Sequence, residues 1–130
     1  MFKHRKENIG AIKYTKEHRK AYKDIEKKLL GHNTWRSFAH DLDKVILYNF
    51  WEFKKVKKFH RNTARHHENK IKKNRNDYID MIIDWECARY TKPDKPLNAY
   101  DTLYKFYPHL EKEILPILKE FKLDYHTKNL

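Results

Sequence analysis

Cysteine and glycine are scarce in this chain of 130 residues, and proline is uncommon. With one cysteine, Cys87, the chain cannot form an internal disulfide, which favours a reducing, cytoplasmic location. Two glycines and four prolines are too few for the many turns of an all-β protein, and they exclude a Gly-rich phosphate-binding loop. No apolar run approaches the roughly 18 residues of a membrane span. We therefore expect no transmembrane helix, no signal-peptide core and no membrane partner.

Helix-forming residues and positive charge are abundant instead. Hydrophobic residues make up 39% of the chain and aromatic residues 15%, which is enough for one modest core. Lys, Glu, Leu, Ile and Tyr favour helices, so we predict a single all-α domain of five or six helices. The net charge of +12 favours anionic partners such as nucleotides or nucleic acid.

Apolar residues recur at helical spacing along most of the chain. Trp35 and Phe38 fall on the predicted apolar face of the second helix. Gly31 predicts a C-cap, Asn98 predicts an N-cap, and Pro116 predicts a kink or break in the last helix. The expected helices run from about 8 to 30, 34 to 49, 78 to 89, 98 to 107 and 109 to 125, with a partly helical segment between 50 and 75.

An adjacent pair, His40 and Asp41, stands inside the second expected helix. Asp41 lies three residues after Phe38 and four before Val45, which places it near the buried face, with His40 on the edge of that face. An imidazole nitrogen and a carboxylate oxygen both suit divalent transition metals. His18 has helical spacing from its apolar neighbours, which places it on the inward face of the first helix. Asp84 falls on the border of the apolar face of the helix that follows residue 77. These residues are the candidates for a metal site.

Together with His60, His66 and His67, this ordered set resembles the HD-domain superfamily of metal-dependent phosphohydrolases. The run from His40 to Lys44 is similar to that family's stretch of His-Asp, an aliphatic residue, a variable residue and Lys. The likeness covers about Tyr14 to Arg89. The same set of residues also looks like that of a small phage-associated group of HD-like proteins. It implies one HD-like domain over residues 1–130, with the metal-site core at about 8–90 and C-terminal helices at about 98–125.

The resemblance implies a site for a divalent transition metal such as Mn, Fe, Co, Ni or Zn. Its four ligands would be His18, His40, Asp41 and Asp84. The alternatives are a buried polar network without an ion, or a His–Asp pair that caps a helix. Four such groups, drawn from three expected helices, favour the metal site over both alternatives.

Three downstream histidines, His60, His66 and His67, are candidates for a second ion or a phosphate contact. On a continuous helix His60 and His67 would share a face, whereas His66 would point about 100° away from His67. The alternative is a solvated cationic surface, because histidines in so basic a chain will cluster somewhere.

Several charged residues near these histidines are candidates for contact with a substrate. Lys44 lies one helical turn after His40 and can hold a substrate phosphate as a point charge. Arg61 and Arg65 can offset charge on the phosphoryl oxygens. An ordinary surface position is the alternative for each of them. We expect Asp43 to face solvent.

The predicted function is hydrolysis of a nucleotide or another small phosphorylated anion by metal-activated water. The residues predicted to take part in catalysis are Asp41, Lys44, His60 and His67. The alternative is a small basic protein, phage-encoded and acting in the host cell, that binds nucleic acid or a protein and keeps only a structural or vestigial metal site. Nucleic acid would bind through the basic run from Lys54 to Arg75. Within that region we expect Trp51, Phe53 and Phe59 to belong to the core.

Overall fold

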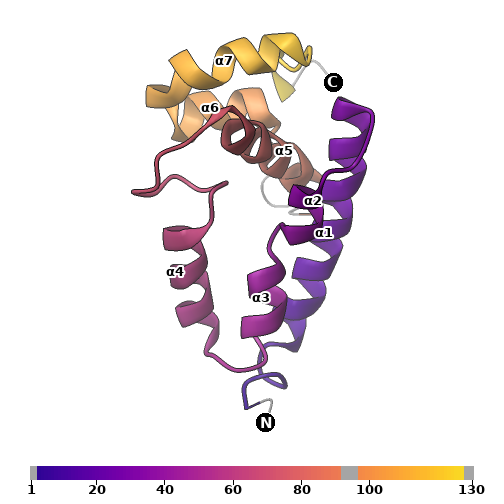
Figure 1. Cartoon of the computed structure of the whole chain (residues 1–130), viewed down its shortest axis with the longest axis vertical. Coiled ribbons are helices and arrows are strands. Elements are labelled where there is room, and N and C mark those ends of the chain that lie inside the picture. The colour runs from indigo at the N-terminus through magenta and orange to yellow at the C-terminus, as the bar shows by residue number, and fades with distance from the viewer. Residues whose placement is uncertain (1–2, 92–96, 128–130) are drawn as a thin grey trace. The chain divides into compact units, whose positions relative to one another are not determined.

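The computed structural model describes residues 3–91 and 97–127 (Figure 1). Within these ranges every regular element is a helix, so the predicted all-α class is confirmed. The six expected helical segments are present, and the second of them is divided in two. The chain forms two compact units, Met1–Lys72 and Lys73–Leu130. The HD-like domain stays a prediction.

The described part of the first unit contains α1 (Ile9–Leu30), α2 (Trp35–Ala39), α3 (Leu42–Leu47) and α4 (Phe53–Thr63). In Figure 1, α2 and α3 lie along α1, and α4 packs against α3. Asn8 precedes α1, and its side-chain amide donates to the carbonyls of Tyr48 at 2.9 Å and Trp51 at 2.8 Å. Because both carbonyls belong to the turn between α3 and α4, these bonds tie that turn to the start of α1.

Gly31 ends α1 in the left-handed conformation, with a φ of 81°. Its N–H donates to the carbonyl of Lys27 at 2.8 Å, which satisfies one of the last carbonyls of the helix. The predicted C-cap is therefore confirmed. Glycine suits this position because it has no Cβ to clash with the backbone at positive φ.

A buried carboxylate, Glu26, fixes the turn that follows α1. It accepts hydrogen bonds from the Thr34 N–H at 2.8 Å, the Thr34 hydroxyl at 2.7 Å and the Asn33 amide at 3.1 Å. Burial alone would raise the pKa of Glu26, but these donors hold it below its ordinary value of 4.5. Glu26 thereby holds Thr34 at the N-cap position of α2.

The apolar face predicted for the second helix is wrong for its first residues. Trp35 is 76% exposed and Phe38 is 63% exposed. The end of α2 is instead held by polar contacts with Arg19 of α1, whose guanidinium donates to the carbonyl of Phe38 and, at 2.8 Å, to that of His40. Tertiary contacts have overridden the helical spacing here.

The helix α4 stops at Thr63, and Ala64 is extended. The prediction that His60 and His67 share one helical face is therefore wrong, as is the angle it implied for His66. Asn69 braces the segment that follows. Its amide donates to the carbonyl of Ala64 at 2.7 Å, and also to that of Arg61 at 2.9 Å. This bracing turns residues 64–69 back toward the end of α4.

Two aromatic residues of α4 that were predicted to be buried lie on its outward face. Phe53 and Phe59 are exposed, whereas Val56 and His60 are the buried residues of this helix. The expectation that Phe53 and Phe59 belong to the core is therefore wrong.

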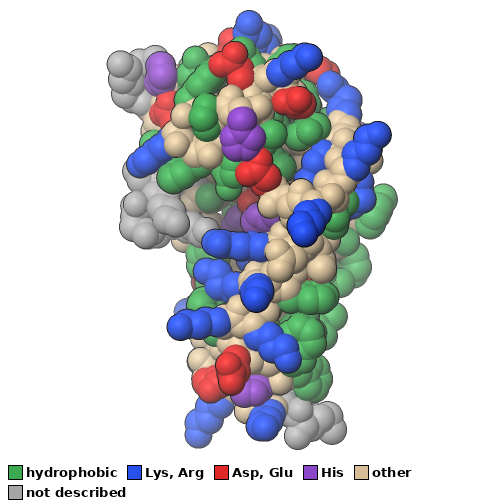
Figure 2. Space-filling model, turned by 90° about the vertical axis from the view of Figure 1, so that its left-hand side faces the viewer, with side chains coloured by type: hydrophobic (Ala, Val, Ile, Leu, Met, Phe, Trp, Pro, Cys, Tyr) green, Lys and Arg blue, Asp and Glu red, His purple; other side chains and the backbone are tan. Residues whose placement is uncertain are grey.

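Figure 2 views the side of the molecule on which α4 lies in Figure 1, and Lys and Arg side chains gather over the lower part of this face.

The described part of the second unit contains α5 (Arg75–Thr91), α6 (Ala99–Phe106), a 3-10 turn η1 (Pro108–Leu110) and α7 (Glu111–Glu120). The helix α5 packs against α6 and α7. Ile82, Ile83 and Cys87 of α5 are fully buried, and burial extends around most of the helix. Cys87 is therefore a core residue of this unit. No helix of the described residues is both long and apolar enough to span a lipid bilayer.

Asn98 caps α6 as predicted, since its side chain accepts from the Asp101 N–H at 2.9 Å. The same side chain donates to the carbonyl of Tyr125 at 2.7 Å. Pro116 lies inside α7, which continues past it. The end of α7 is closed by Lys122, a non-glycine residue with a φ of 59°.

Candidate metal centre

Asp41 stands at the break between α2 and α3, in the left-handed conformation with a φ of 56°. This φ is uncommon for a residue with a side chain, although aspartate tolerates it better than most. It ends one short helix and starts the next, which divides the helix predicted over 34–49. The Asp41 side chain is 4% exposed. The predicted burial of Asp41 is therefore confirmed, but by a turn instead of a helical face.

Two imidazoles approach one oxygen of this carboxylate. The Nε2 of His18 lies 3.8 Å from Asp41 Oδ2, and the Nε2 of His40 lies 3.5 Å from the same atom. His18 comes from the buried side of α1, as its spacing predicted. His40 is buried too, with its ring stacked on Tyr22 at a centroid distance of 3.8 Å. Three of the four predicted ligands therefore meet within the first unit.

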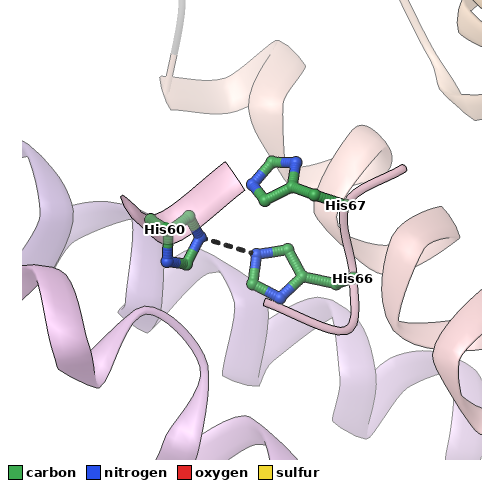
Figure 3. Close-up of side chains that lie close together, drawn as sticks. All are labelled: His60, His66 and His67. Atoms are coloured by element: carbon green, nitrogen blue, oxygen red, sulfur yellow. Dashed lines mark hydrogen bonds between the residues drawn. The ribbon is translucent and has the colours of Figure 1, made fainter. Parts of the chain in front are cut away.

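Two further imidazoles approach the other oxygen. The Nε2 of His60 lies 2.9 Å from Asp41 Oδ1, and the Nε2 of His66 lies 3.2 Å from it. The two Nε2 atoms are themselves 3.1 Å apart (Figure 3). His60 projects from the last turns of α4, whereas His66 comes from the segment that Asn69 braces. Asp41 Oδ1 and the Nε2 atoms of His60 and His66 thus form a small triangle of nearly equal sides.

The spacing within this triangle fits the chemistry of a transition-metal site. Neighbouring ligands of an ion bound at about 2.1 Å lie about 3.0 Å apart in octahedral and about 3.4 Å apart in tetrahedral geometry. All three sides of the triangle fall close to this range. Imidazole nitrogen and carboxylate oxygen also suit Mn, Fe, Co, Ni and Zn. The buried His/Asp groups of the first unit can therefore hold a metal ion.

His67 completes a cluster of three imidazoles. Its ring centroid lies 4.9 Å from that of His60 and 4.5 Å from that of His66 (Figure 3). One nitrogen from each ring falls within a distance that a single ion can bridge. His60, His66 and His67 are therefore brought together by a turn, although the helical spacing had predicted that His66 points away.

Asp43 was expected to face solvent, and this expectation is wrong. It lies in the first turn of α3, and its two carboxylate oxygens accept from His60 Nδ1 at 2.9 and 3.0 Å. The side chain is 33% exposed, against 2% for His60. No spacing signal in the sequence points to this contact, because it depends on the packing of α4 against α3.

The charges of the centre stabilise one another. Burial alone would raise the pKa of the Asp41 carboxyl, but His40, His60 and His66 hold it well below its ordinary 3.8. Burial would lower the pKa of His60, but Asp41 and Asp43 raise it above its ordinary 6.5. Burial and the same two carboxylates raise the pKa of the neighbouring Tyr48 to about 12. The centre thus combines ionised carboxylates with imidazole groups.

Among the cations predicted to hold a phosphate, Lys44 lies beside the centre. Its Nζ is 3.8 Å from Asp41 Oδ2, and its side chain is 19% exposed. Arg61 is exposed on α4. The guanidinium of Arg65 donates to the carbonyl of Lys72 at 3.2 Å within its own segment. The structure thus places Lys44 at the carboxylate, whereas the substrate roles of both arginines stay predictions.

Asp84, the fourth predicted ligand, lies on α5 in the second unit and is partly buried. Its ligation of the same ion stays a prediction. Comparison of the chain with protein-family models, curated proteins and solved structures finds no match.

Proposed function

We propose that this protein is a metal-dependent phosphohydrolase of the HD-domain type, acting on a nucleotide or another small phosphorylated anion. The observation that carries the proposal is the environment of Asp41, whose two oxygens each face a separate pair of imidazoles. His18, His40 and Asp41 would hold one ion with Asp84 as the fourth ligand. His60, His66 and His67 would hold a second ion or contact phosphate.

A divalent ion held there would polarise a phosphate oxygen and lower the pKa of a bound water. Asp41 contributes its ionised carboxylate, which the surrounding imidazoles keep deprotonated. Lys44 supplies a positive charge 3.8 Å from that carboxylate, where it can offset charge on phosphoryl oxygens. The positive net charge of the chain would also concentrate anionic substrates near the protein.

The experiment that tests this proposal combines metal analysis with phosphate release. Wild-type protein loaded with Mn²⁺, Co²⁺, Ni²⁺ or Zn²⁺ should release phosphate from one or more members of a nucleotide panel. The Asp41→Asn variant should lose both metal and phosphate release while retaining its helicity. Asp24→Asn is the matched control, because Asp24 is an exposed residue of α1. Full phosphate release by a metal-free protein, or by Asp41→Asn, would contradict the proposal.

A second candidate function, nucleic-acid binding, is favoured by the surface of α4. The helix carries four exposed basic residues and contains no acidic residue. Lys54, Lys58 and Arg61 follow one another at intervals of four and three residues, so they form one stripe on its outer side. A basic stripe of this kind can follow a phosphate backbone without reading sequence.

This candidate makes a separate prediction about salt. The Lys54→Ala/Lys58→Ala variant should bind a labelled single-stranded oligonucleotide more weakly, and its slope of log affinity against log salt should be shallower by about 1.4. The Lys16→Ala/Lys20→Ala variant is the control, because it removes two exposed lysines at the same spacing from α1. Absence of wild-type binding at low salt would rule out this function.

A further inference from the structure

Both ring nitrogens of His60 face a carboxylate, and the two carboxylates stand two residues apart at the start of α3, with Asp41 at its N-cap position and Asp43 in its first turn. Nδ1 lies 2.9 Å from Asp43 Oδ2, and Nε2 lies 2.9 Å from Asp41 Oδ1. The ring itself is almost completely buried, with 2% of the side chain exposed. His60 is therefore held between Asp43 on the Nδ1 side and, on the Nε2 side, Asp41 and the Nε2 of His66 at 3.1 Å, and water has little access to either nitrogen.

A neutral imidazole carries one N–H and one lone pair, so Asp43 on one side of the ring and Asp41 and His66 on the other compete for a single proton. An ionised carboxylate can only accept a hydrogen bond. If Nδ1 carries the proton and donates it to one side, the lone pair is on Nε2, and the reverse holds when Nε2 carries the proton. A metal ion needs the lone pair. It follows that His60 can act as a ligand through Nε2 only when its proton is on Nδ1.

We infer that Asp43 is the residue that selects this tautomer, and that it thereby positions His60 Nε2 as a metal ligand beside Asp41 and His66. Asp43 offers both of its oxygens to Nδ1, at 2.9 and 3.0 Å. Carboxylates that accept from the second nitrogen of a ligating histidine fix the ring orientation and increase the basicity of the ligating nitrogen. Asp43 does not reach the ion itself in this role. It is a positioning residue.

The position of Asp43 in the first turn of α3 has another explanation, which is a favourable interaction with the helix dipole. That interaction needs only a negative charge near the helix start. It does not explain why both oxygens meet one buried nitrogen of a histidine from another helix. The inference rests on the proposed metal centre, and it does not depend on the identity of the substrate.

Removal of the Asp43 charge tests this role through metal affinity. In Asp43→Asn the amide can either accept from or donate to Nδ1, so the tautomer is no longer selected. The proton of His60 can then lie on Nε2, where it donates to Asp41. An incoming ion must displace this proton before it can bind Nε2. We expect calorimetric titration with Zn²⁺ or Mn²⁺ to show an affinity about 10- to 100-fold lower than that of wild type, with unchanged helicity. Asp24→Asn, which also removes one negative charge, should bind as wild type does.

The tautomer is read directly by nitrogen-15 NMR of the histidine rings in the zinc-loaded wild-type protein. We expect the proton of His60 on Nδ1 and the metal on Nε2, and this measurement needs no variant that folds. A proton on Nε2 of the loaded protein would overturn the inference, as would unchanged affinity in a folded Asp43→Asn variant. Wild-type protein that takes up neither ion would overturn it as well. Protein that binds metal but hydrolyses no phosphorylated compound would contradict only the proposed function.

Discussion

The carboxylate of Asp41 and the imidazole of His60 face each other at 2.9 Å, and each favours the charged form of the other. This pairing predicts how the stability of the metal-free protein depends on pH. The pKa of His60 is raised in the folded state, so its contribution is fully present below its ordinary pKa of 6.5. The contribution is lost as the pH rises through the higher pKa of the folded state.

Urea unfolding in the presence of a chelator should therefore show a free energy of unfolding that decreases as the pH rises above 6.5. In His60→Gln this decrease should be smaller, because the titrating ring is gone. The contribution of the Asp41 carboxyl to the free energy of unfolding has the opposite dependence on pH. Its pKa is lowered from 3.8, so its contribution is present above that value and is lost as the pH falls through the lower pKa of the folded state. An unfolding free energy of His60→Gln that follows wild type at every pH would contradict the pairing.

Metal loading should reverse the trend at neutral pH. Histidine ligands must be deprotonated to bind an ion, so the stabilisation that Zn²⁺ or Mn²⁺ provides should increase as the pH rises from about 5 to 7. Thermal unfolding of wild-type protein with and without the ion, across this range, measures the effect. The difference in melting temperature should vanish at every pH in Asp41→Asn, because the carboxylate between the two pairs of imidazoles is lost.

The buried carboxylate of Glu26 should be important for stability and unimportant for metal chemistry. Glu26→Gln replaces one of the two accepting oxygens by an amide that cannot accept from Thr34. We expect a loss of about 1–3 kcal/mol in the free energy of unfolding. Glu17→Gln, at an exposed position of the same helix, should have little effect. Equal stability of the two variants would show that Glu26 does not hold the turn.

The end of α7 offers a stabilising substitution. Lys122 adopts a φ of 59°, while its N–H donates to the carbonyl of Lys119 and the Leu123 N–H donates to that of Leu118. This is the hydrogen-bond pattern in which glycine is usual. Lys122→Gly should therefore raise the free energy of unfolding by about 0.5–1 kcal/mol. Lys119→Gly, inside the helix, should lower it by about 1 kcal/mol. A destabilised Lys122→Gly would contradict this explanation.

Asn98 joins the start of α6 to the C-terminal segment, since it accepts from the Asp101 N–H and donates to the Tyr125 carbonyl. Asn98→Ala should lower the free energy of unfolding by about 2–3 kcal/mol, because it removes a cap and leaves a carbonyl without its donor. Asn76→Ala, an exposed position of α5, is the control. Circular dichroism during urea unfolding would measure both variants, and similar midpoints would contradict the role of Asn98.

Composition predicted the all-α class, helical spacing predicted the inward positions of His18 and Asp41, and residue type predicted the caps at Gly31 and Asn98. Helical spacing is a weaker guide to where a helix breaks. It could not predict the break at Asp41, because a left-handed residue inside an apolar periodic stretch is stabilised by tertiary contacts and has no local signature. The exposure of Trp35 and Phe38 has the same cause, since polar contacts with Arg19 replace an apolar face.

The approach of His66 to His60 could not be predicted from the sequence either. It depends on the end of α4 at Thr63 and on the bracing by Asn69, which turns the following segment back. Spacing along a continuous helix gives the wrong geometry for residues on the two sides of such a turn. The contact of Asp43 with His60 was missed for a related reason, because its partner lies on a different helix.

The backbone at Asp41 has a consequence for any attempt to make this protein more robust. Its φ of 56° is one that glycine adopts at no steric cost and that asparagine tolerates well. Glycine or asparagine at position 41 would therefore relieve the backbone, but each would remove the carboxylate around which four imidazoles gather and whose ionised form stabilises the folded state. Thermostabilising redesign of this fold must hold that one position fixed and seek its gains elsewhere.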